Sequence, residues 1–526
     1  MTNSIAETLK NDAIFIIGSN TSENHPVIAT MMKRAKKNGS KIIVADPRRI
    51  EMAEWADLFL QIKPGTNIAL INGMCHVIIR DGLMDQEFIE ENTANFEDLK
   101  ETLKKYTPEH ASAISGVPAQ DIVKAAHMYA EAGAAGIYYA MGITQHSKGT
   151  HAVMSLSNLA LITGNIGKEN AGINPLRGQN NVQGACDMGA LPADFPGYQK
   201  VIKPAVREAF EGYWGRPLSG KVGLTLSEVI NAVTKDDVRM LWVFGENPAV
   251  SDPDTTHVEH ALDHCEFLVV SDLFMTETAE FADVILPAAS FAEKEGTFTN
   301  TERRVQRIRQ AVRPRGNSKP DWEIFMEVMN RLGYDKKYLN PSQIFDEITM
   351  VTPSYAGMDY ERIDQVGLQW PCPTKEHEGT KYLHKNKIAK GIGLLVPVEY
   401  QDPMETTDTE YPYILTTGRI LYQYHTMSMT GKTEGLNELT GDSYVEISPD
   451  MASRYELNEG DLISLATRRG RIQTSVKITD IIEDEVIFMP FHFAQGANVL
   501  TNTALDEIAK IPELKVCAVR LEKEVV

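Results

Sequence analysis

The sequence predicts an α/β chain with two parallel-sheet domains followed by a C-terminal β-barrel. Two observations support this fold class. A strand–turn–helix–strand pattern occurs twice within roughly the first 300 residues, and roughly the last 120 contain short runs rich in β-branched and aromatic side chains. The chain has 526 residues, of which 43% are hydrophobic and 24% charged. That balance is ordinary for a globular protein, and the length suffices for about three or four domains.

The first copy of the pattern is AIFIIGSNTSENHPVIATMMKRAKKNGSKIIVADPRR. Residues 14–17 form an unbroken apolar run, as expected for a strand that is buried on both faces. Gly18 begins a turn, Pro26 suits the first turn of a helix, and the basic residues up to Lys37 suit its end. A second apolar run ends at Asp46. This segment therefore predicts a β–α–β unit of a parallel sheet.

The same pattern returns further along the chain. Residues 240–244 form an apolar run, Gly245 begins the turn, and the next run ends near Asp272. The separation is 28 positions from Gly18 to Asp46 and 27 from Gly245 to Asp272. In both copies an Ala-Asp pair then opens one more apolar run. Two units of matching length predict two pseudo-symmetric domains with a Rossmann-like fold.

Such paired units suit nucleotide binding. In open α/β sheets, ligands bind beyond the carboxyl ends of the strands. A turn into a helix offers backbone N–H groups to a pyrophosphate, and an acidic residue at the next strand end can accept hydrogen bonds from a ribose or a purine edge. The pattern alone leaves the alternative open, because parallel α/β proteins also repeat such units without a nucleotide. Neither copy contains GxGxxG.

The remaining segments supply the domain boundaries. Residues from about 321 to 408 begin with a helical pattern and continue through turn-forming residues, which suggests a covering segment with little sheet. The runs YPYILTT, DLISLAT, IQTSVKI and DEVIFMPF follow and predict a barrel with small helices. The predicted parts are a first α/β domain, a second α/β domain, a covering segment with linker, and the barrel, at residues 1–179, 180–291, 292–408 and 409–526.

Charge and cysteine usage limit the partners and the compartment. Lys and Arg total 52 against 72 Asp and Glu, for a net charge of −20, so we expect no nucleic-acid partner. No stretch reaches the ~18 apolar residues of a membrane span, and the N-terminus lacks a signal-peptide pattern. The five cysteines are scattered, without a CxxC pair. They indicate a reducing cytoplasm and offer no zinc or iron–sulfur motif.

A polar segment without helix or strand periodicity occupies residues 174–189, NPLRGQNNVQGACDMG. Long polar loops in compact domains are usually functional. Arg177 is its one cation and lies among amide side chains. An arginine fixed by such neighbours suits a small carboxylate, which it can clamp with two hydrogen bonds. A structural arginine at a domain junction is an equally good interpretation of the residues alone.

This segment also carries a family resemblance. RGQNNVQGACDMG resembles the signature of formate dehydrogenase catalytic subunits in the molybdopterin oxidoreductase family. GSNTSENHP, ADPR, MGITQH, TGNIGKENAG, FGENP and ADVILPAASFAEKEGTFTN resemble motifs shared more widely in that family, and the C-terminal region resembles its double-psi-type barrel. The resemblance covers essentially the whole chain and implies formate oxidation. The alternatives are action on nitrate, a sulfoxide or an arsenic oxyanion, or a non-catalytic cofactor-binding subunit.

The resemblance implies a cofactor of two molybdopterin guanine dinucleotides around one molybdenum or tungsten atom, with one dinucleotide for each β–α–β unit. Residues matching the contacts of the first dinucleotide are Gly18, Asn20, Asp46, Arg48, Gly65 and Asn67. Those matching the second are Gly245, Asn247, Asp272 and Thr276, with Gly142 and Thr144 placed between strand and phosphates. A segment that wraps over the cofactor is matched by Glu295, Gly296, Thr297 and Asn300, and the barrel residues that cap the pterins are matched by Arg419, His425, Asn498 and Lys515.

The resemblance further implies that Arg177 orients formate at the metal and that Gln179 supports it. Two electrons pass from formate to the metal and leave through an iron–sulfur cluster to an electron-transfer subunit or a hydrogenase-type partner. The metal does the redox work, and the protein contributes positioning and electrostatics.

The chain departs from the family pattern at its start. That pattern has a four-iron four-sulfur domain, then a Cys or selenocysteine metal ligand followed by a His, all ahead of the region matching Met1. Cys186 matches a different family cysteine, so no residue here is predicted to bind the metal. Our hypothesis for the missing ligand is that it is a selenocysteine whose codon was interpreted as a stop. The alternatives are a truncation or a split into two subunits. An in-frame TGA upstream of Met1 would support the selenocysteine hypothesis. We expect this chain, made alone, not to oxidise formate.

Overall fold

The computed structural model describes residues 1–385 and 387–523. It divides into two compact units. The first unit comprises Met1–Leu176, Pro248–Val258 and Tyr382–Val526, and the second comprises Arg177–Asn247 and Glu259–Lys381. The four domains that the sequence predicts do not correspond one to one with these two units, and their boundaries stay a prediction.

The first unit begins with a five-stranded sheet of order β3-β2-β1-β5-β6, in which every strand pairing is parallel. Its strands are β1 (Ala13–Ile17), β2 (Lys41–Asp46), β3 (Leu58–Gln61), β5 (Ala135–Tyr139) and β6 (Gly172–Pro175). Phe15 and Ile17 pack into one hydrophobic core, whereas Ile14 and Ile16 pack into another on the opposite face. Both faces of the sheet are therefore buried, as the unbroken apolar run predicts.

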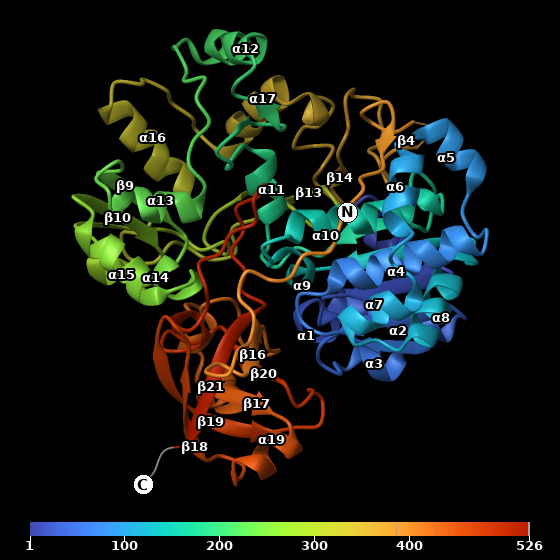
Figure 1. The fold of residues 1–526 in the computed structure, drawn as a ribbon. Coiled ribbons are helices and arrows are strands. Elements are labelled where there is room, and N and C mark those ends of the chain that lie inside the picture. Colours follow the sequence, from blue (N-terminus) through green and yellow to red (C-terminus); the bar gives the residue numbers. More distant parts are fainter. Residues whose placement is uncertain (386, 524–526) are drawn as a thin grey trace. The chain divides into compact units, whose positions relative to one another are not determined.

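Helices cover both faces of this sheet, in the blue to cyan part of Figure 1. One core joins the sheet to α4, α8 and α10, and the other joins it to α2 and α3. The helices are α1 (Thr21–Asn24), α2 (Pro26–Lys37), α3 (Met52–Trp55), α4 (Asn67–Arg80), α5 (Gln86–Asn92), α6 (Phe96–Leu103), α7 (Pro108–Ser115), α8 (Ala119–Ala130), α9 (Met141–Thr144) and α10 (Gly149–Ile162). A short parallel pair, β4 (Thr93–Ala94) with β15 (Gly393–Leu394), links distant parts of the chain.

The C-terminal part of the first unit is a closed barrel of order β16-β20-β17-β19-β18-β21. Its strands are β16 (Tyr413–Gly418), β17 (Tyr444–Ile447), β18 (Leu462–Ala466), β19 (Arg471–Ile478), β20 (Val486–Pro490) and β21 (Cys517–Lys523), with α18 (Glu434–Thr440) and α19 (Pro449–Arg454) between strands. Inward side chains such as Leu415, Ile463 and Ile487 form one buried core. The predicted barrel with small helices is thus confirmed.

The second unit contains a three-stranded parallel sheet of order β11-β10-β9. Its strands are β9 (Met240–Phe244), β10 (Phe267–Asp272) and β11 (Val284–Pro287). Antiparallel strands β12 (Gly296–Thr299), β13 (Arg304–Ile308) and β14 (Leu368–Gln369) form a second small sheet. The helices are α11 (Val182–Asp187), α12 (Pro204–Trp214), α13 (Leu226–Val233), α16 (Asp321–Arg331) and α17 (Pro341–Val351), while α14 (Pro248–Ser251) and the start of α15 (Thr255–His264) fall in the first unit.

The two β–α–β units share their turn geometry as well as their spacing. Gly18 has a φ of +58° and Gly245 a φ of +63°. The Gly18 N–H donates to the Ala45 carbonyl at 3.0 Å, and the Gly245 N–H donates to the Ser271 carbonyl at 2.8 Å. Each turn therefore begins with the same left-handed glycine tied to the same place on the next strand.

Asp57 and Asp283, the aspartates of the two Ala-Asp pairs, make equivalent contacts in the two units. The Asp57 carboxylate accepts the backbone N–H of Ile42 at 2.8 Å, and the Asp283 carboxylate accepts that of Leu268 at 2.7 Å. Each aspartate thus holds the start of the preceding strand. The predicted α/β class with a repeated parallel unit is confirmed, and the two copies also share corresponding hydrogen bonds.

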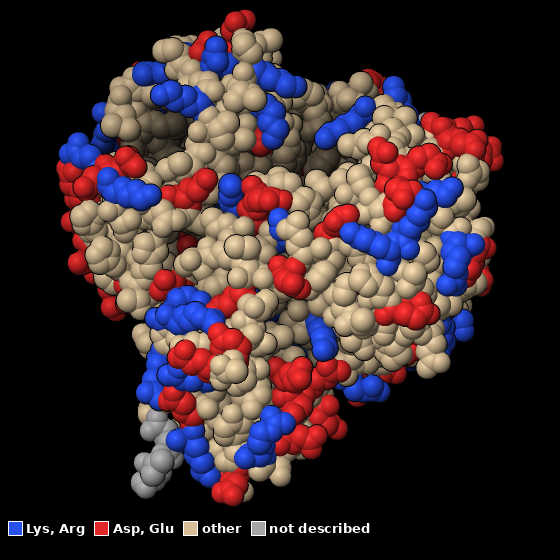
Figure 2. Space-filling model, in the orientation of Figure 1, with Lys and Arg blue, Asp and Glu red and all other residues tan. Residues whose placement is uncertain are grey.

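The surface mixes charges of both signs. On the face shown in Figure 2, Lys and Arg side chains are interspersed with Asp and Glu and form no single broad basic field. Among the described residues, no helix has the length and apolar character that crossing a membrane requires.

Candidate functional site

The turn after β1 lies against the turn after β5. Gly142 donates its backbone N–H to the Gly18 carbonyl at 3.0 Å. A Cβ on either glycine would lie within 2.7 Å of a backbone atom of the other, so neither position accommodates a side chain. The Asn67 amide donates to the Gly142 carbonyl at 3.2 Å. The fold thus brings together three cofactor residues that the sequence predicted from separate segments.

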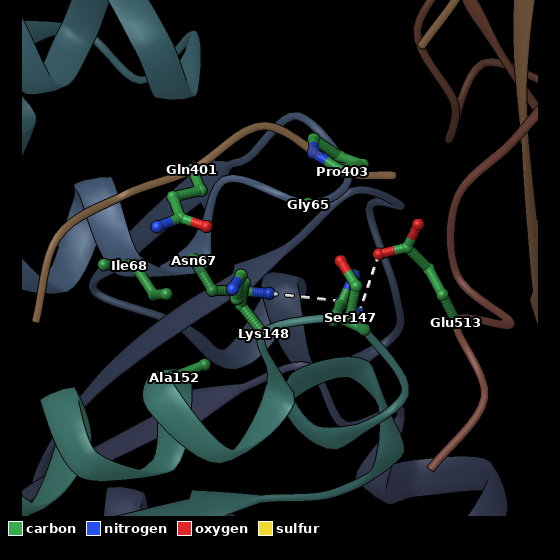
Figure 3. Close-up of a pocket in the computed structure, with 10 residues that line it drawn as sticks. Gly65, Asn67, Ile68, Ser147, Lys148, Ala152, Gln401, Pro403 and Glu513 are labelled. Carbon is green, nitrogen blue, oxygen red and sulfur yellow. Dashed lines mark hydrogen bonds between the residues drawn. The ribbon is translucent and has the colours of Figure 1, made fainter. Parts of the chain in front are cut away.

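A small pocket beside this contact is shown in Figure 3, with Gly65, Asn67 and Glu513 among its lining residues. His146 also lines it, and its Nε2 is 2.9 Å from the Gly142 carbonyl oxygen. Because a carbonyl can only accept, Nε2 carries the proton and Nδ1 is an acceptor. Nδ1 is buried and has no hydrogen-bond partner in the described part of the chain. Burial lowers the pKa of His146, which keeps the ring neutral.

Two carboxylates of the C-terminal region bind backbone N–H groups around the start of α10, and one of them, Glu513, also lines this pocket. Glu513 accepts the Ser147 N–H at 2.7 Å, as Figure 3 shows. Asp506 accepts the N–H of Thr150 at 2.9 Å and its hydroxyl at 2.7 Å. Both carboxylates therefore bind free N–H groups at the start of α10, where a helix favours negative charge.

Five basic side chains gather near this end of the first unit: Lys515, Arg419, His25, His425 and His492. Burial, and then the charge of Arg419, lowers the pKa of Lys515 to about 7 and the pKa of His25 and of His425 to about 4. Burial also lowers the pKa of Arg419 itself. The histidines are therefore neutral at neutral pH, whereas Arg419 and the partly protonated Lys515 are buried cations that repel each other and form a favourable site for an anion. The sequence analysis singled out Lys515, Arg419 and His425 but missed the two other histidines.

His492 has a structural task in this cluster. Its Nε2 accepts the backbone N–H of Ile420 at 3.0 Å, and its Nδ1 donates to the backbone carbonyl of His425. Its ring is 1% exposed. It therefore ties together the two ends of the segment that carries Arg419 and His425. Only the pairing of distant segments reveals this role.

The end of β2 places Asp46 and Arg48 in different surroundings. Asp46 accepts the Arg48 N–H at 3.0 Å, and burial raises the pKa of Asp46 to about 6. The Arg48 guanidinium pairs with Glu446 at 2.8 Å and lies 3.7 Å from the centre of the Phe488 ring. The guanidinium thus pairs with Glu446, whose buried charge requires a partner. The contact of Arg48 with the cofactor stays a prediction.

Three other predicted residues of the first unit have defined local contacts. Gly65 has a φ of +87°, and a Cβ there would lie 2.5 Å from Pro403. The Thr144 hydroxyl contacts the Met141 sulfur at 3.3 Å. The Asn498 amide donates to two carbonyls of α14, at 2.7 and 3.1 Å. Their contacts with a cofactor stay predictions.

In the second unit, the predicted residues surround the turn after β9 and the end of β10. Asn247 Oδ1 accepts the Thr278 N–H at 3.1 Å and its hydroxyl at 2.7 Å. The Thr276 hydroxyl oxygen accepts a backbone N–H at 3.2 Å. Burial raises the pKa of Asp272, the counterpart of Asp46. The second repeat thus also holds a partly desolvated carboxylate at a strand end, beside a turn begun by Gly245.

The predicted wrapping segment forms the start of the β12–β13 hairpin. Gly296 and Thr297 begin β12, directly after Glu295. Asn300 Oδ1 accepts the Glu302 N–H at 3.1 Å and so fixes the turn. Asn300 therefore has a structural role in the hairpin, and its contact with the cofactor stays a prediction.

Arg177 lies between β6 and α11. Its Nε donates to Gln183 Oε1 at 3.3 Å, and its backbone N–H donates to the Thr301 hydroxyl at 3.3 Å. Gln183 is 4% exposed and belongs to α11. The glutamine that contacts Arg177 is thus Gln183, which the sequence analysis did not single out although it lies in the same signature. The role of Gln179 stays a prediction.

A metal ligand was not predicted in this chain. Within residues 1–385 and 387–523, no group of three or more His, Cys, Asp or Glu side chains could hold a metal ion. Burial raises the pKa of the Cys186 thiol, so this cysteine is protonated at neutral pH.

Comparison with known families decides the assignment. Residues 1–331 match the family described as Molybdopterin oxidoreductase. The chain belongs to this family. Residues 413–518 match the Molydopterin dinucleotide binding domain, which corresponds to the barrel. For this molybdopterin oxidoreductase, the two matches agree in general terms with a molybdopterin dinucleotide cofactor.

Two curated relatives of this molybdopterin oxidoreductase are formate dehydrogenases by name. The chain is 54% identical over 528 residues to the F420-dependent formate dehydrogenase subunit alpha of Methanocaldococcus jannaschii, covering 99% of this chain and 78% of the relative. It is 41% identical over 530 residues to formate dehydrogenase H of Escherichia coli, covering 99% and 74%. Acetylene hydratase from Pelobacter acetylenicus has a similar structure, with a TM-score of 0.78, 22% identity, and coverage of 99% and 80%. That likeness shows the fold alone.

Proposed function

We propose that this chain is the catalytic subunit of a formate dehydrogenase, which converts formate into CO2, a proton and two electrons. The observation that carries the proposal is Arg177, whose Nε is held by the buried Gln183. A guanidinium held in one plane can clamp both oxygens of a small carboxylate. The names of the two relatives described above support formate as the substrate.

The residues present fit two molybdopterin guanine dinucleotides. Asn20 Oδ1 and His146 Nδ1 are buried acceptors without partners in the described part of the chain, and guanine and pterin rings carry N–H donors that would satisfy them. The cluster around Arg419 and Lys515 suits phosphate or pterin oxygens. When bound with molybdenum or tungsten, this group supplies the two-electron chemistry.

The chain's own residues then bind and orient the reactants. Arg177 holds formate, while Gln183 and Gln179 support the guanidinium. Asp46 and Asp272 accept hydrogen bonds from the two guanine nucleotides. The family resemblance implies that an iron–sulfur cluster would take the electrons to an electron-transfer subunit or hydrogenase-type partner. A cytoplasmic location also belongs to this proposal, in agreement with five free cysteines.

Another molybdopterin oxidoreductase, acting on nitrate, a sulfoxide or an arsenic oxyanion, is the alternative enzyme. A non-catalytic cofactor-binding subunit is the alternative outside enzymes. Each alternative predicts that the assembled holoenzyme does not oxidise formate, so formate turnover by the parent enzyme separates them from the proposal.

The test is a kinetic comparison in the assembled holoenzyme, with an artificial electron acceptor. Arg177→Lys keeps the charge but loses the planar fork, and we expect kcat/KM for formate to fall by about 10²-fold or more. Arg207→Lys, on a surface helix where Arg207 faces Glu211, is the control. Formate kinetics that are equal in Arg177→Lys and the control would rule out the role of Arg177, and a parent holoenzyme without formate-dependent reduction of the acceptor would refute the formate assignment.

A further inference from the structure

Asp187 is a buried carboxylate in the signature segment that the proposed mechanism does not use. It is 1% exposed and accepts four side-chain hydrogen bonds. Gln183 Nε2 and the Tyr198 hydroxyl each donate to Oδ1 at 2.8 Å. The Tyr355 hydroxyl donates to Oδ2 at 2.6 Å, and Trp370 Nε1 at 2.7 Å. Four donors thus satisfy both oxygens of this buried carboxylate.

The polarity of this network determines how Gln183 is oriented. An ionised carboxylate can only accept, so the NH₂ end of the Gln183 amide must face Asp187. The same NH₂ group also reaches the Tyr198 hydroxyl at 2.9 Å. The carbonyl end of Gln183 then faces away from Asp187 and accepts from Arg177 Nε at 3.3 Å. Three side chains therefore form one directed chain of hydrogen bonds.

We propose that Asp187 is a positioning residue that sets the plane of the Arg177 guanidinium through Gln183. This inference rests on the proposed role of Arg177 as the formate clamp and names the residue that orients its guanidinium. Without the charge of Asp187, the contact with Arg177 Nε at 3.3 Å is left as the main interaction that keeps the Gln183 carbonyl toward Arg177. A flipped amide would present an N–H donor to a guanidinium that can only donate.

Asp187→Asn is the informative substitution because it keeps the shape and changes the polarity. Trp370 Nε1 and Gln183 Nε2 contact opposite oxygens, and Trp370 Nε1 can only donate. If the asparagine NH₂ replaces Oδ2, it faces the Trp370 N–H. If the NH₂ replaces Oδ1, it faces the NH₂ of Gln183 and drives that amide to flip. Removing the Trp370 donor lets the asparagine turn its NH₂ toward the Tyr355 hydroxyl, which can accept.

The experiment measures formate kinetics of the assembled holoenzyme in four variants. In Asp187→Asn we expect KM for formate to rise about tenfold or more, with a smaller change in kcat, because a charged hydrogen-bond network is broken. Gln183→Leu removes the acceptor of Arg177 and should raise KM in the same way. Asp187→Asn combined with Trp370→Phe should restore KM to within about threefold of Trp370→Phe alone.

A matched control separates positioning from stability. Asp57→Asn changes a carboxylate outside the site, which accepts the backbone N–H of Ile42 and pairs with Lys36. It should lower the thermal unfolding midpoint without raising KM for formate. KM values that stay unchanged in Gln183→Leu, or that rise equally in Asp57→Asn, would overturn the inference even if Asp187→Asn fails to assemble. If Arg177→Lys itself leaves formate kinetics unchanged, the proposed role of Arg177 as the formate clamp fails, and this inference fails with it.

Discussion

Arg48, just after β2, pairs with Glu446 of the barrel strand β17, with 2.8 Å between Nη2 and Oε2. The two residues are 398 positions apart in the sequence. The Glu446 side chain is 1% exposed, and its other oxygen is 3.1 Å from Lys477 Nζ. A buried ion pair thus joins the first parallel sheet to the barrel.

Removing one partner of this pair should destabilise the first unit. Arg48→Met leaves the buried Glu446 charge with Lys477 alone, and we expect a loss of about 3 kcal/mol in the free energy of unfolding. Lys477→Met should cost much less, because the Lys477 side chain is 46% exposed. Denaturant titration of both variants measures the difference. Equal midpoints for Arg48→Met and the parent chain would contradict this account.

The two repeats should hold two separate nucleotides. Acid release followed by nucleotide chromatography should find about two guanine nucleotides per holoenzyme. Asp46→Ala and Asp272→Ala each remove the carboxylate of one repeat, so each should lose about one nucleotide. Asp98→Ala, at an exposed position of α6, should lose none. One nucleotide or none in the parent enzyme would eliminate the two-site arrangement.

Lys515 should make the stability of the cofactor-free chain depend on pH. Its folded pKa of about 7 lies below the ordinary value of 10.5, so the unfolded state binds the proton more tightly. The resulting penalty is complete below pH 7 and disappears as the pH rises toward 10.5. Lys515→Met should therefore raise the unfolding midpoint at pH 6 to 7 and remove part of this dependence.

The same substitution should weaken cofactor retention, because Lys515 belongs to the cationic cluster around Arg419. Guanine nucleotide content per chain should fall in Lys515→Met while the apo chain becomes more stable. Since Asp46 and Arg48 also act on Lys515, the difference between variant and parent at each pH is the informative quantity. A variant that is less stable than the parent at pH 6 would contradict the sign.

His492 should hold the loop that carries Arg419 and His425. His492→Phe keeps a ring but loses both backbone hydrogen bonds, each worth about 1 kcal/mol. We expect faster loss of guanine nucleotide on dilution, with the barrel still folded by circular dichroism. Because the pKa of His492 lies at about 4, the parent should show no such loss between pH 6 and 8. His492→Gln retains a donor and an acceptor, so its rate of nucleotide loss should lie between those of His492→Phe and the parent. If His492→Phe loses nucleotide no faster than the parent, His492 does not have this role.

Much of the fold could be predicted because its signals are local. The apolar run of β1, the glycine turn and the aspartate at the end of β2 are periodic features, and their recurrence near Gly245 needed no tertiary information. The barrel strands are likewise visible in their β-branched composition. The α/β class, the repeated unit and the barrel were therefore correct.

The sequence by itself determined the repeat, the barrel and the family, because the signals of each lie in contiguous residues, and it named Arg177 as a candidate clamp for formate. Only the tertiary structure decided which side chains Arg177 and Arg48 contact. Gln183 and Gln179 are both glutamines of one signature, and what selects Gln183 is the buried charge of Asp187 behind it. The contact of Arg48 with Glu446 could not be predicted, because the two residues are 398 positions apart, and the contact of Arg48 with a cofactor stays a prediction. A buried charge takes whichever partner the packing brings within about 3 Å, and that proximity is a property of the folded chain rather than of any local pattern.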